Sequence, residues 1–305
     1  MTLKIWPGAE QRFDEMADFI STHNPKGEHH IGYFGVTPED TRQSIRSLDV
    51  PFDEGFRLAY DDGLLVGVMG IDADAEIGRA WLYGPIVGAS ADASADASAV
   101  DESWAAVADV LYEAVGAAVP AGITEHEMFV DADNRHCRAF AERHGFKSHG
   151  EWAIYFMTPD RLALLPEGAA DEWDERFSEQ FAALHESLFP RSNYTLPYMM
   201  AEVAKGAVLC ILSNGAELAG YFFGRTEPES GEAYVDLVGV ADAYRRRGLG
   251  RRLMLAGLAR LREMPELRQV NLTVSGGNDA AMLLYDSLGF ERERDMVAFR
   301  KTIEN

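Results

Sequence analysis

The sequence predicts an α/β protein made of two similar domains, and three observations carry this prediction. The chain has 305 residues, about twice the ~150 residues of an ordinary single domain. Hydrophobic residues make up 47% and charged residues 26%, so large cores can form without disulfides or metals. Strand-like and helix-like segments alternate in both halves. We therefore expect two mixed, mostly antiparallel twisted sheets, each flanked by helices.

An internal repeat links the two halves. Five positions match in register at an offset of 144 (278 − 134): Asn134, Cys137, Phe140, Gly145 and Phe146 against Asn278, Ala281, Leu284, Gly289 and Phe290. An apolar, strand-like segment follows in each half. This agreement favours duplication of one unit over a chance likeness between two helix-to-strand turns.

The predicted domains are 1–158 and 159–305. The alternating pattern is lost around Thr158 and Pro159, and an amphipathic stretch begins anew at Trp173. The tract 89–99, ASADASADASA, has little to bury and is expected to form a loop within the first domain.

The second half can be divided into elements. Asn214 and Gly215 form a hairpin signal between the apolar runs 207–212 and 217–224. The pattern then predicts a strand over 233–240, a helix over 248–264, a strand over 270–274, a helix over 278–288 and a last strand around Phe299. The order is that of a mixed α/β sheet.

Charge and cysteine content narrow the functional classes. With 28 Lys and Arg against 50 Asp and Glu, the formal charge of −22 disfavours binding to nucleic acid or anionic membrane. The acidity fits either a solubility trait or attraction of a cationic substrate. No bilayer-spanning run or signal peptide is seen, which predicts a cytoplasmic protein. Cys137 and Cys210 lack metal or redox spacing and are expected in the cores, so no metal site is predicted.

A basic glycine loop follows the strand that ends at Val240. The segment Arg245–Gly250, RRRGLG, opens a helix whose first N–H groups and positive dipole end can receive phosphate oxygens. A solvated basic turn is the alternative. The loop lacks the Gly-Lys-Ser/Thr ending of a Walker loop and the third glycine of a dinucleotide fold, which disfavours nucleotide hydrolysis and hydride transfer.

Two motifs together resemble the GNAT superfamily of acetyl-CoA-dependent N-acyltransferases across about 205–301. The first is R-x-x-G-x-G at Arg245, Gly248 and Gly250, and the second is N-x-x-A-x-x-L-Y, from Asn278 to Tyr285, followed by Gly289-Phe290. The resemblance implies acetyl-CoA as the acyl donor and the GNAT fold. It also implies donor contacts from Val238, Val240, Arg245, Arg246, Arg247, Gly248, Leu249, Gly250, Arg251, Asn278, Ala281 and Tyr285.

Acyl transfer to an amine needs help at three points: the oxyanion, the leaving thiolate and the amine proton. The resemblance implies a backbone N–H from the splayed strand end 238–240 for the oxyanion. Tyr285 is the candidate general acid, since a phenol of pKa about 10 can protonate a thiolate of similar basicity. A packing role on the helix is the alternative for Tyr285, and simple helix capping is the alternative for Asn278.

Asp236 is the candidate general base. Period two along the strand places Tyr234, Asp236 and Val238 on one face, and a carboxylate within an apolar strand is costly unless it is paired, exposed or functional. An exposed aspartate on a wet sheet face, Glu232 and bound water are the alternatives.

The first half is expected to lack a donor site. We call the basic glycine loop Arg245–Gly250 the cradle. At the offset of 144, Asp101, Trp104 and Ala106 align with Arg245, Gly248 and Gly250 of the cradle, and Ala141 aligns with Tyr285. Such a domain can support the active one, bind a ligand or help to wall the acceptor pocket. Candidate pocket residues are His29, His30, Tyr33 and Phe34, and in the second half Tyr194 and Tyr198.

The predicted function is transfer of an acetyl group from acetyl-CoA to a primary amine of a small molecule or peptide, by direct attack in a ternary complex. The alternative is a CoA-thioester-binding regulatory module without turnover. The sequence leaves the identity of the acceptor and the oligomeric state open, because acceptor specificity resides in variable loops.

Overall fold

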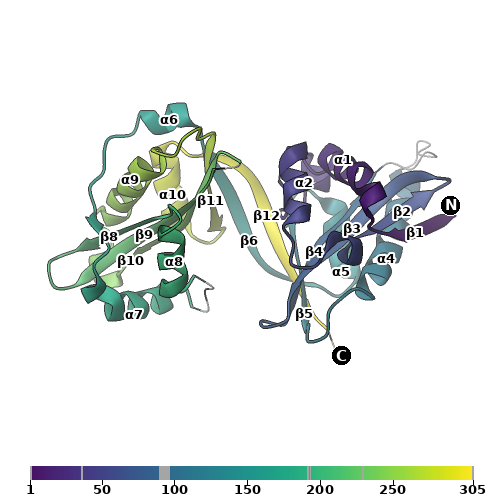
Figure 1. The fold of residues 1–305 in the computed structure, drawn as a ribbon, viewed down its shortest axis with the longest axis horizontal. Coiled ribbons are helices and arrows are strands. Elements are labelled where there is room, and N and C mark those ends of the chain that lie inside the picture. Colours follow the sequence, from purple (N-terminus) through teal and green to yellow (C-terminus); the bar gives the residue numbers. More distant parts are fainter. Residues whose placement is uncertain are drawn as a thin grey trace. The chain divides into compact units, whose positions relative to one another are not determined.

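The computed structural model describes residues 2–35, 37–88, 97–190, 192, 194–228 and 230–303 (Figure 1). The chain divides into two compact units: unit 1 comprises Met1–Trp152 and Arg294–Asn305, and unit 2 comprises Ala153–Glu293. This division differs from the predicted one in two ways. The boundary falls before 158, and the final segment belongs to unit 1 rather than to the second domain.

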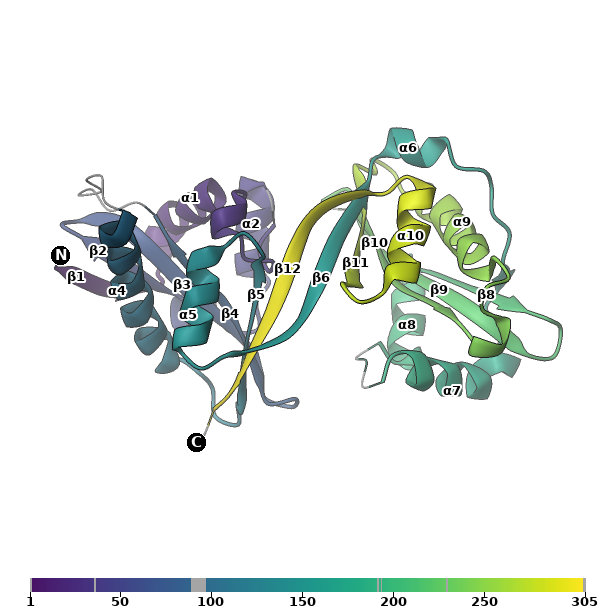
Figure 2. The same cartoon turned by 180° about the vertical axis from the view of Figure 1, so that it is seen from behind.

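Unit 1 is an α/β unit with the strand order β1-β2-β3-β4-β5-β12. Its sheet is antiparallel apart from the β4–β5 pair. Its elements are β1 (Leu3–Pro7), α1 (Phe13–His23), α2 (Pro38–Arg46), α3 (Phe52–Gly55), β2 (Arg57–Asp61), β3 (Leu64–Asp74), β4 (Arg79–Val87), α4 (Ala97–Gly116), β5 (Glu125–Asp131), α5 (Arg135–Arg143), the first part of β6 (Lys147–Met157) and β12 (Glu291–Thr302) from Arg294 onward. Helices α4 and α5 cover one face of the sheet, and α1 and α2 cover the other (Figure 2).

Unit 2 repeats this plan with the strand order β6-β11-β10-β9-β8-β7. Its elements are the end of β6 from Ala153, α6 (Pro159–Ala163), β7 (Asp171–Glu172), α7 (Ser178–Leu188), α8 (Leu196–Val203), β8 (Val208–Ser213), β9 (Leu218–Glu227), β10 (Glu232–Val240), α9 (Leu249–Leu261), β11 (Gln269–Ser275) and α10 (Asp279–Leu288). The predicted hairpin, strands and helices of this half are all present, with small differences at their ends.

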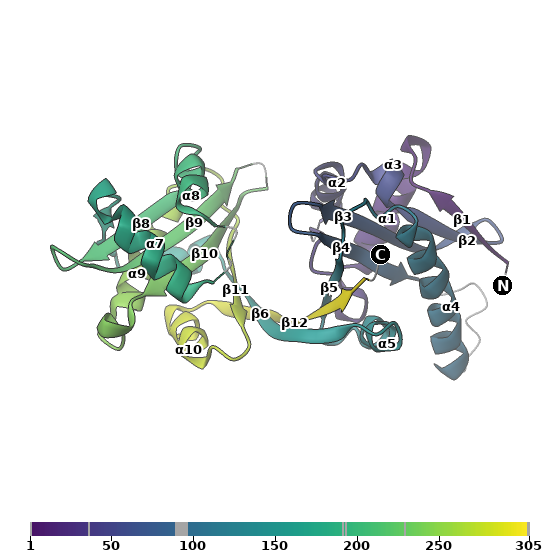
Figure 3. The same cartoon turned by 90° about the horizontal axis from the view of Figure 1, so that it is seen from below.

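Two apolar cores lie on the two faces of the unit 2 sheet. The first, which we call the α9/α10 core, contains Leu253 and Leu258 of α9 and Leu288 of α10. The second, the α7/α8 core, contains Phe181 of α7 and Met199 of α8. Figure 3 shows α7 and α8 on one side of the strands and α10 on the other. Cys137 and Cys210 are both free and buried, as predicted.

The structure bears out the internal repeat. Helices α5 and α10 begin after Asn134 and Asn278, and each asparagine side chain accepts a hydrogen bond from the backbone N–H three residues later. Strands β5 and β11 also correspond at the offset of 144. Because Arg79 pairs with Glu125 and Glu232 pairs with Gln269, strands β4 and β10 instead correspond at 153 (232 − 79).

Each unit takes its last strand from the other half of the repeat. Strand β6 follows α5, yet its end from Ala153 lies beside β11 in unit 2. Strand β12 follows α10, yet it pairs with β5 in unit 1 from Met296↔Asp131 to Thr302↔Glu125. Sequence periodicity finds both strands but says nothing about which sheet receives them. This exchange accounts for the misplaced final segment in the predicted domains.

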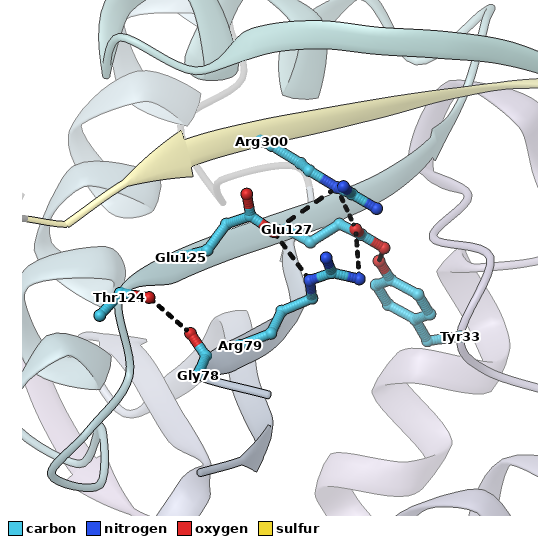
Figure 4. Close-up of polar contacts among 7 residues, drawn as sticks. All are labelled: Tyr33, Gly78, Arg79, Thr124, Glu125, Glu127 and Arg300. Atoms are coloured by element: carbon cyan, nitrogen blue, oxygen red, sulfur yellow. Dashed lines mark hydrogen bonds and ion pairs between the residues drawn. The ribbon is translucent and has the colours of Figure 1, made fainter. Parts of the chain in front are cut away.

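Charged side chains fasten β12 within unit 1 (Figure 4). Arg300 Nε lies 2.6 Å from Glu127 Oε2, and Arg79 Nε lies 2.8 Å from Glu125 Oε1. Tyr33 donates a hydrogen bond of 3.3 Å to Glu127. With both arginines matched by carboxylates, the cluster holds the strand in place at little net charge.

Candidate active site

A β-bulge at Asp236 shapes the centre of unit 2. In the β9–β10 pair, Val235 lies opposite Gly224 and Leu237 opposite Phe223, so Asp236 is the extra residue. The bulge reverses the alternation: Val235 and Val238 both belong to the α9/α10 core, whereas Leu237 belongs to the α7/α8 core. The prediction that Asp236 and Val238 share a face is therefore wrong, because period two does not continue through a bulge.

Beyond the bulge, β10 leaves β11. The parallel register of these strands runs from Glu232↔Gln269 to Val235↔Leu272, while pairing with β9 continues to Val240. Ala241 N–H donates to Ala219 on the β9 side. Since alternate residues of an antiparallel strand point their N–H and C=O groups to opposite neighbours, Val238 and Val240 direct theirs to the edge that β11 has left. This edge can pair with an extended ligand.

The basic loop forms a concave turn at the end of this edge. Arg246 and Gly248 both have left-handed backbones, with φ of 59° and 76°, and Gly248 is the N-cap of α9. Glycine has no side chain to accept hydrogen bonds, so the first-turn N–H groups, including those of Leu249 and Gly250, receive no side-chain cap. Such a turn at a helix N-terminus is a general anion-binding arrangement.

The arginines of the loop are held by local contacts. Arg245 lies 3.0 Å from Asp242 and donates to the Val240 carbonyl, and Arg247 donates to the Ala243 carbonyl. Arg251, one turn into α9, donates to Ser287 Oγ at 2.9 Å. This last contact ties the start of α9 to α10.

Helix α10 brings Tyr285 into the same region. The space beside Gly250 is bordered by Leu284, the neighbour of Tyr285, and a Cβ at Gly250 would lie 3.5 Å from its side chain. Tyr285 is 9% exposed, and its hydroxyl makes no hydrogen bond within the part of the chain that the structure describes. Burial raises the pKa of Tyr285 to about 12. At neutral pH the phenol is therefore protonated and has a proton to donate.

Asn278 and Ala281 lie at the start of α10. The side chain of Asn278 caps the helix through the Ala281 N–H at 3.2 Å. Capping is thus one function that this asparagine performs.

Asp236 is not a free carboxylate. Its side chain is 6% exposed, and Arg225 binds both oxygens, with Nη2–Oδ1 of 2.9 Å and Nε–Oδ2 of 3.0 Å. Tyr194 adds a hydrogen bond of 3.0 Å to Oδ1. These three donors leave about one lone-pair position on the carboxylate, on Oδ2. The alternative base Glu232 accepts a hydrogen bond from Tyr234.

Aromatic rings surround this ion pair. The Arg225 guanidinium lies 5.7 Å from the ring centroid of Tyr194 and 5.9 Å from that of Tyr234. Tyr198, at 38% exposure, packs edge-on against Tyr194. The sequence pointed to Tyr194, Tyr198 and Asp236 separately, and the structure brings them together.

Unit 1 differs from unit 2 along the corresponding edge of β4. Val238 corresponds to Pro85, which has no N–H, and the Pro85 carbonyl accepts a contact of 3.4 Å from the Cys137 thiol on α5. The β5 edge facing this gap pairs with the chain itself: Gly32 N–H donates to Phe129, and Ile31 bridges Val130. In unit 1, therefore, residues of the unit itself occupy the strand edge that is open in unit 2.

The predicted match of Asp101, Trp104 and Ala106 with the cradle requires correction. These residues lie inside α4, which starts at Ala97, whereas the cradle precedes α9. The offset changes from 153 to 144 between β4 and β5 because α4 is longer than α9. The counterpart of the cradle is the tract after Gly88, and 89–96 lies outside the described residues.

Comparison with known proteins agrees with this geometry. Residues 170–290 match the sequence model of the acetyltransferase (GNAT) family. Unit 2 is a GNAT acetyltransferase domain. The match covers most of this unit and contains the cradle, the open edge and α10.

The curated relatives match a short part of the chain. A mycothiol acetyltransferase from Thermobispora bispora is 52% identical over 71 residues, and one from Rhodococcus erythropolis is 44% identical over 77 residues. These alignments span 23% and 25% of this chain and the same shares of the two relatives. The chain thus matches about a quarter of the length of these proteins.

Solved structures extend the likeness to both units. A GCN5-related N-acetyltransferase from Sphaerobacter thermophilus has a TM-score of 0.67 at 16% identity, covering 99% of this chain and 96% of that one. A tandem GNAT protein from the clavulanic acid biosynthesis pathway has a TM-score of 0.58 at 17% identity, covering 100% and 99%. At such identities the likeness establishes the fold. The chain has a tandem GNAT fold.

The described residues contain neither a metal-binding cluster nor a membrane-spanning helix. Among the described residues, no group of three or more His, Cys, Asp or Glu side chains is placed to hold a metal ion. None of the helices in the described ranges has the length and apolar character needed to cross a bilayer.

Sequence reasoning missed Arg225. This arginine ends the apolar run of β9 and lies opposite Tyr234 across the hairpin. A charged residue just after a buried strand was a visible signal. Its pairing with Asp236 depends on the register and the bulge, which the sequence does not specify.

Proposed function

We propose that this protein is an acetyl-CoA-dependent N-acetyltransferase with one active site per chain, in the GNAT domain, and that its acceptor is a primary amine. The observation that carries the proposal is the meeting of three features in this domain. The open edge at Val238 and Val240, the cradle at Arg245–Gly250 and the helix bearing Tyr285 lie next to one another.

The donor site follows from these features. The cradle and its arginines receive the pyrophosphate, and the pantetheine arm pairs with the open edge of β10. The backbone N–H of Val238 or Val240 on that edge then donates a hydrogen bond to the thioester carbonyl oxygen. The corresponding edge of unit 1 has Pro85 in place of Val238 and is occupied by its own chain, which supports a single donor site.

The reaction is direct attack of the amine on the thioester carbonyl. The new C–N bond forms as the carbonyl oxygen takes up negative charge, which the β10 N–H stabilises. Collapse of this intermediate breaks the C–S bond, and Tyr285 protonates the departing thiolate. The amine attacks in its neutral form, and its nitrogen then loses one proton to solvent or to the remaining position on Asp236 Oδ2. The Tyr285 phenolate regains its proton from solvent. The paired carboxylate is better suited to orienting the amine or a water molecule than to acting as a strong base.

The acceptor site lies on the α7/α8 face. There Tyr194, Tyr198 and Tyr234 surround the Arg225–Asp236 pair. Aromatic rings with a few directed polar groups are typical of small-molecule sites. The name of the curated relatives adds one concrete acceptor to consider, the amine form of mycothiol.

Steady-state kinetics test the proposal. Purified protein is assayed for free thiol with acetyl-CoA and a panel of primary amines that includes unacetylated mycothiol. Tyr285→Phe should lower kcat at least ~100-fold, the usual range for loss of a positioned general acid, and should leave acetyl-CoA affinity unchanged. Leu283→Ala, which alters an exposed residue of the same helix, is the control. Tight binding of acetyl-CoA without turnover on any amine would favour the regulatory-module alternative.

A further inference from the structure

The ring of Tyr285 is held between two other aromatic rings in the α9/α10 core. Its centroid lies 6.1 Å from that of Tyr155, at an interplanar angle of 58°, and 5.9 Å from that of Phe290, at 63°. Both separations are typical of attractive aromatic pairs. Tyr155 is 2% exposed and Phe290 is 4% exposed, so neither ring has room to move away.

Ring packing is what fixes the direction of the Tyr285 hydroxyl. No hydrogen bond within the described residues holds this hydroxyl, so its position depends on how the ring is seated. Phe290 comes from the same chain segment, and its N–H donates to the Tyr285 carbonyl. Tyr155 is the distant partner in sequence, because it lies on β6 at the start of unit 2, 130 residues before Tyr285 (285 − 155).

Strand β6 belongs in sequence to the first half of the repeat, but its end from Ala153 is part of the GNAT domain. Ala153, Tyr155 and Met157, at alternate positions along it, enter the α9/α10 core. The exchange is reciprocal. At the repeat offset of 144, Tyr155 corresponds to Phe299, which β12 carries into the core of unit 1.

We propose that Tyr155 is a positioning residue for Tyr285, so that the half of the repeat without a donor site supplies a side chain on which acyl transfer depends. This inference rests on the proposed function, in which Tyr285 protonates the thiolate. A positioning contact of this kind affects the rate and not donor affinity, since a general acid must lie within hydrogen-bond reach of the leaving atom. It also gives the first half a catalytic contribution that needs no ligand site in unit 1.

A double-mutant cycle on kcat tests the inference. Tyr155→Leu, Tyr155→Phe and Met157→Leu are each made in the wild-type chain and in the Tyr285→Phe chain, and kcat and the KM for acetyl-CoA are measured. Misplacement of a catalytic group can cost up to ~100-fold, and we expect Tyr155→Leu to lower kcat about tenfold at unchanged KM. Tyr155→Phe keeps the ring and should keep the rate. Met157→Leu, equally buried on the same strand, is the matched control.

In the Tyr285→Phe chain, Tyr155→Leu should have no further effect on kcat, because the group it positions is gone. An equal loss in both chains would overturn the inference while leaving the proposed function intact. Unchanged kcat in Tyr285→Phe itself would show that Tyr285 is not the general acid, and the inference would fall with that role while acetyl transfer itself would stand. Tyr155→Met replaces Tyr155→Leu if melting curves show that the leucine variant is unfolded.

Discussion

Arg225 and Asp236 form the most fully enclosed charge pair of the candidate site. Loss of the arginine leaves a carboxylate that is 6% exposed without its cation. Removing one partner of a buried pair typically costs about 3 kcal/mol of unfolding free energy or more. We expect Arg225→Met to destabilise the protein by about this amount and to raise the KM for the amine at least ~10-fold.

The matched control is the double variant Arg225→Met/Asp236→Asn. The double variant removes the orphaned charge and should recover part of the stability in urea denaturation. The KM for acetyl-CoA should stay the same in every variant. A rise in that KM as large as the rise for the amine would show that the pair does not belong to an acceptor site.

Two buried histidines make unit 1 sensitive to acid. His30 and His126 are 4% and 5% exposed, and burial lowers the pKa of each from 6.5 to about 4. The positive charges of Arg294 near His30 and of Lys301 near His126, both on β12, contribute to this lowering of the pKa. Since the unfolded chain binds protons more readily between these values, stability is complete above pH 6.5 and is lost as the pH falls toward 4.

From pH 7 to pH 5, each histidine should remove about 2 kcal/mol from the unfolding free energy. Urea denaturation at the two pH values, followed by fluorescence of the buried Trp104, measures this loss. His126→Gln should reduce the difference between pH 7 and pH 5. An unchanged difference in both His126→Gln and His30→Gln would show that these side chains are not buried in their neutral form.

At single positions, the sequence was informative where a motif names the residue type. Arg245, Gly248 and Tyr285 could be chosen because phosphate loops and general acids need those chemical groups. Val238 could be chosen only through the family resemblance, since the role proposed for it uses its backbone and not its side chain. Tyr155 and Arg225 could not be chosen, because their partners lie across strand pairings that local patterns do not define.

At the scale of elements, periodicity and turn signals predicted the strands and helices of the second half well. The hairpin at Asn214 and the helix after Gly248 follow from local chemistry alone. The destinations of β6 and β12 do not, since either sheet offers an apolar edge to a strand of that pattern. The bulge at Asp236 was also missed, because one inserted residue changes no composition or motif.

The exchanged strand β12 is predicted to be essential for unit 1. A chain ending at Glu293 loses Val297 and Phe299 from the unit 1 core, together with the Arg294–Asp131 ion pair. One buried Phe→Ala change already costs ~3–5 kcal/mol, and whole domains are stable by only ~5–15 kcal/mol. We expect the truncated chain to lose the unfolding transition of unit 1 and to retain that of the GNAT domain.

Circular dichroism during urea titration measures these transitions, and a chain ending at Ile303 is the control. Acetyl-CoA binding gives a second readout, which should persist in the truncated chain because unit 2 ends at Glu293. Two intact transitions after truncation would contradict the assignment of β12 to unit 1.

At the scale of the whole molecule, the chain carries a formal charge of −22 and concentrates arginines at one loop. In the proposed function, Arg245, Arg246 and Arg247 provide a local cationic site for an anionic donor on a protein whose net charge otherwise repels it. The duplicated fold offers two places for such a site. Among the described residues, the glycine cradle and an open strand edge occur together in the second half, whereas Pro85 and the pairing of Ile31 occupy the edge in the first.

Calorimetric titration with acetyl-CoA tests the central claim most directly. The wild-type chain is compared with Arg245→Ala/Arg247→Ala and with Arg262→Ala, a control at the other end of the same helix. We expect one site per chain, weakened at least ~10-fold in the double variant by the loss of charged contacts and unchanged in the control. Two sites per chain, a single site indifferent to the double change, or no binding would contradict the account.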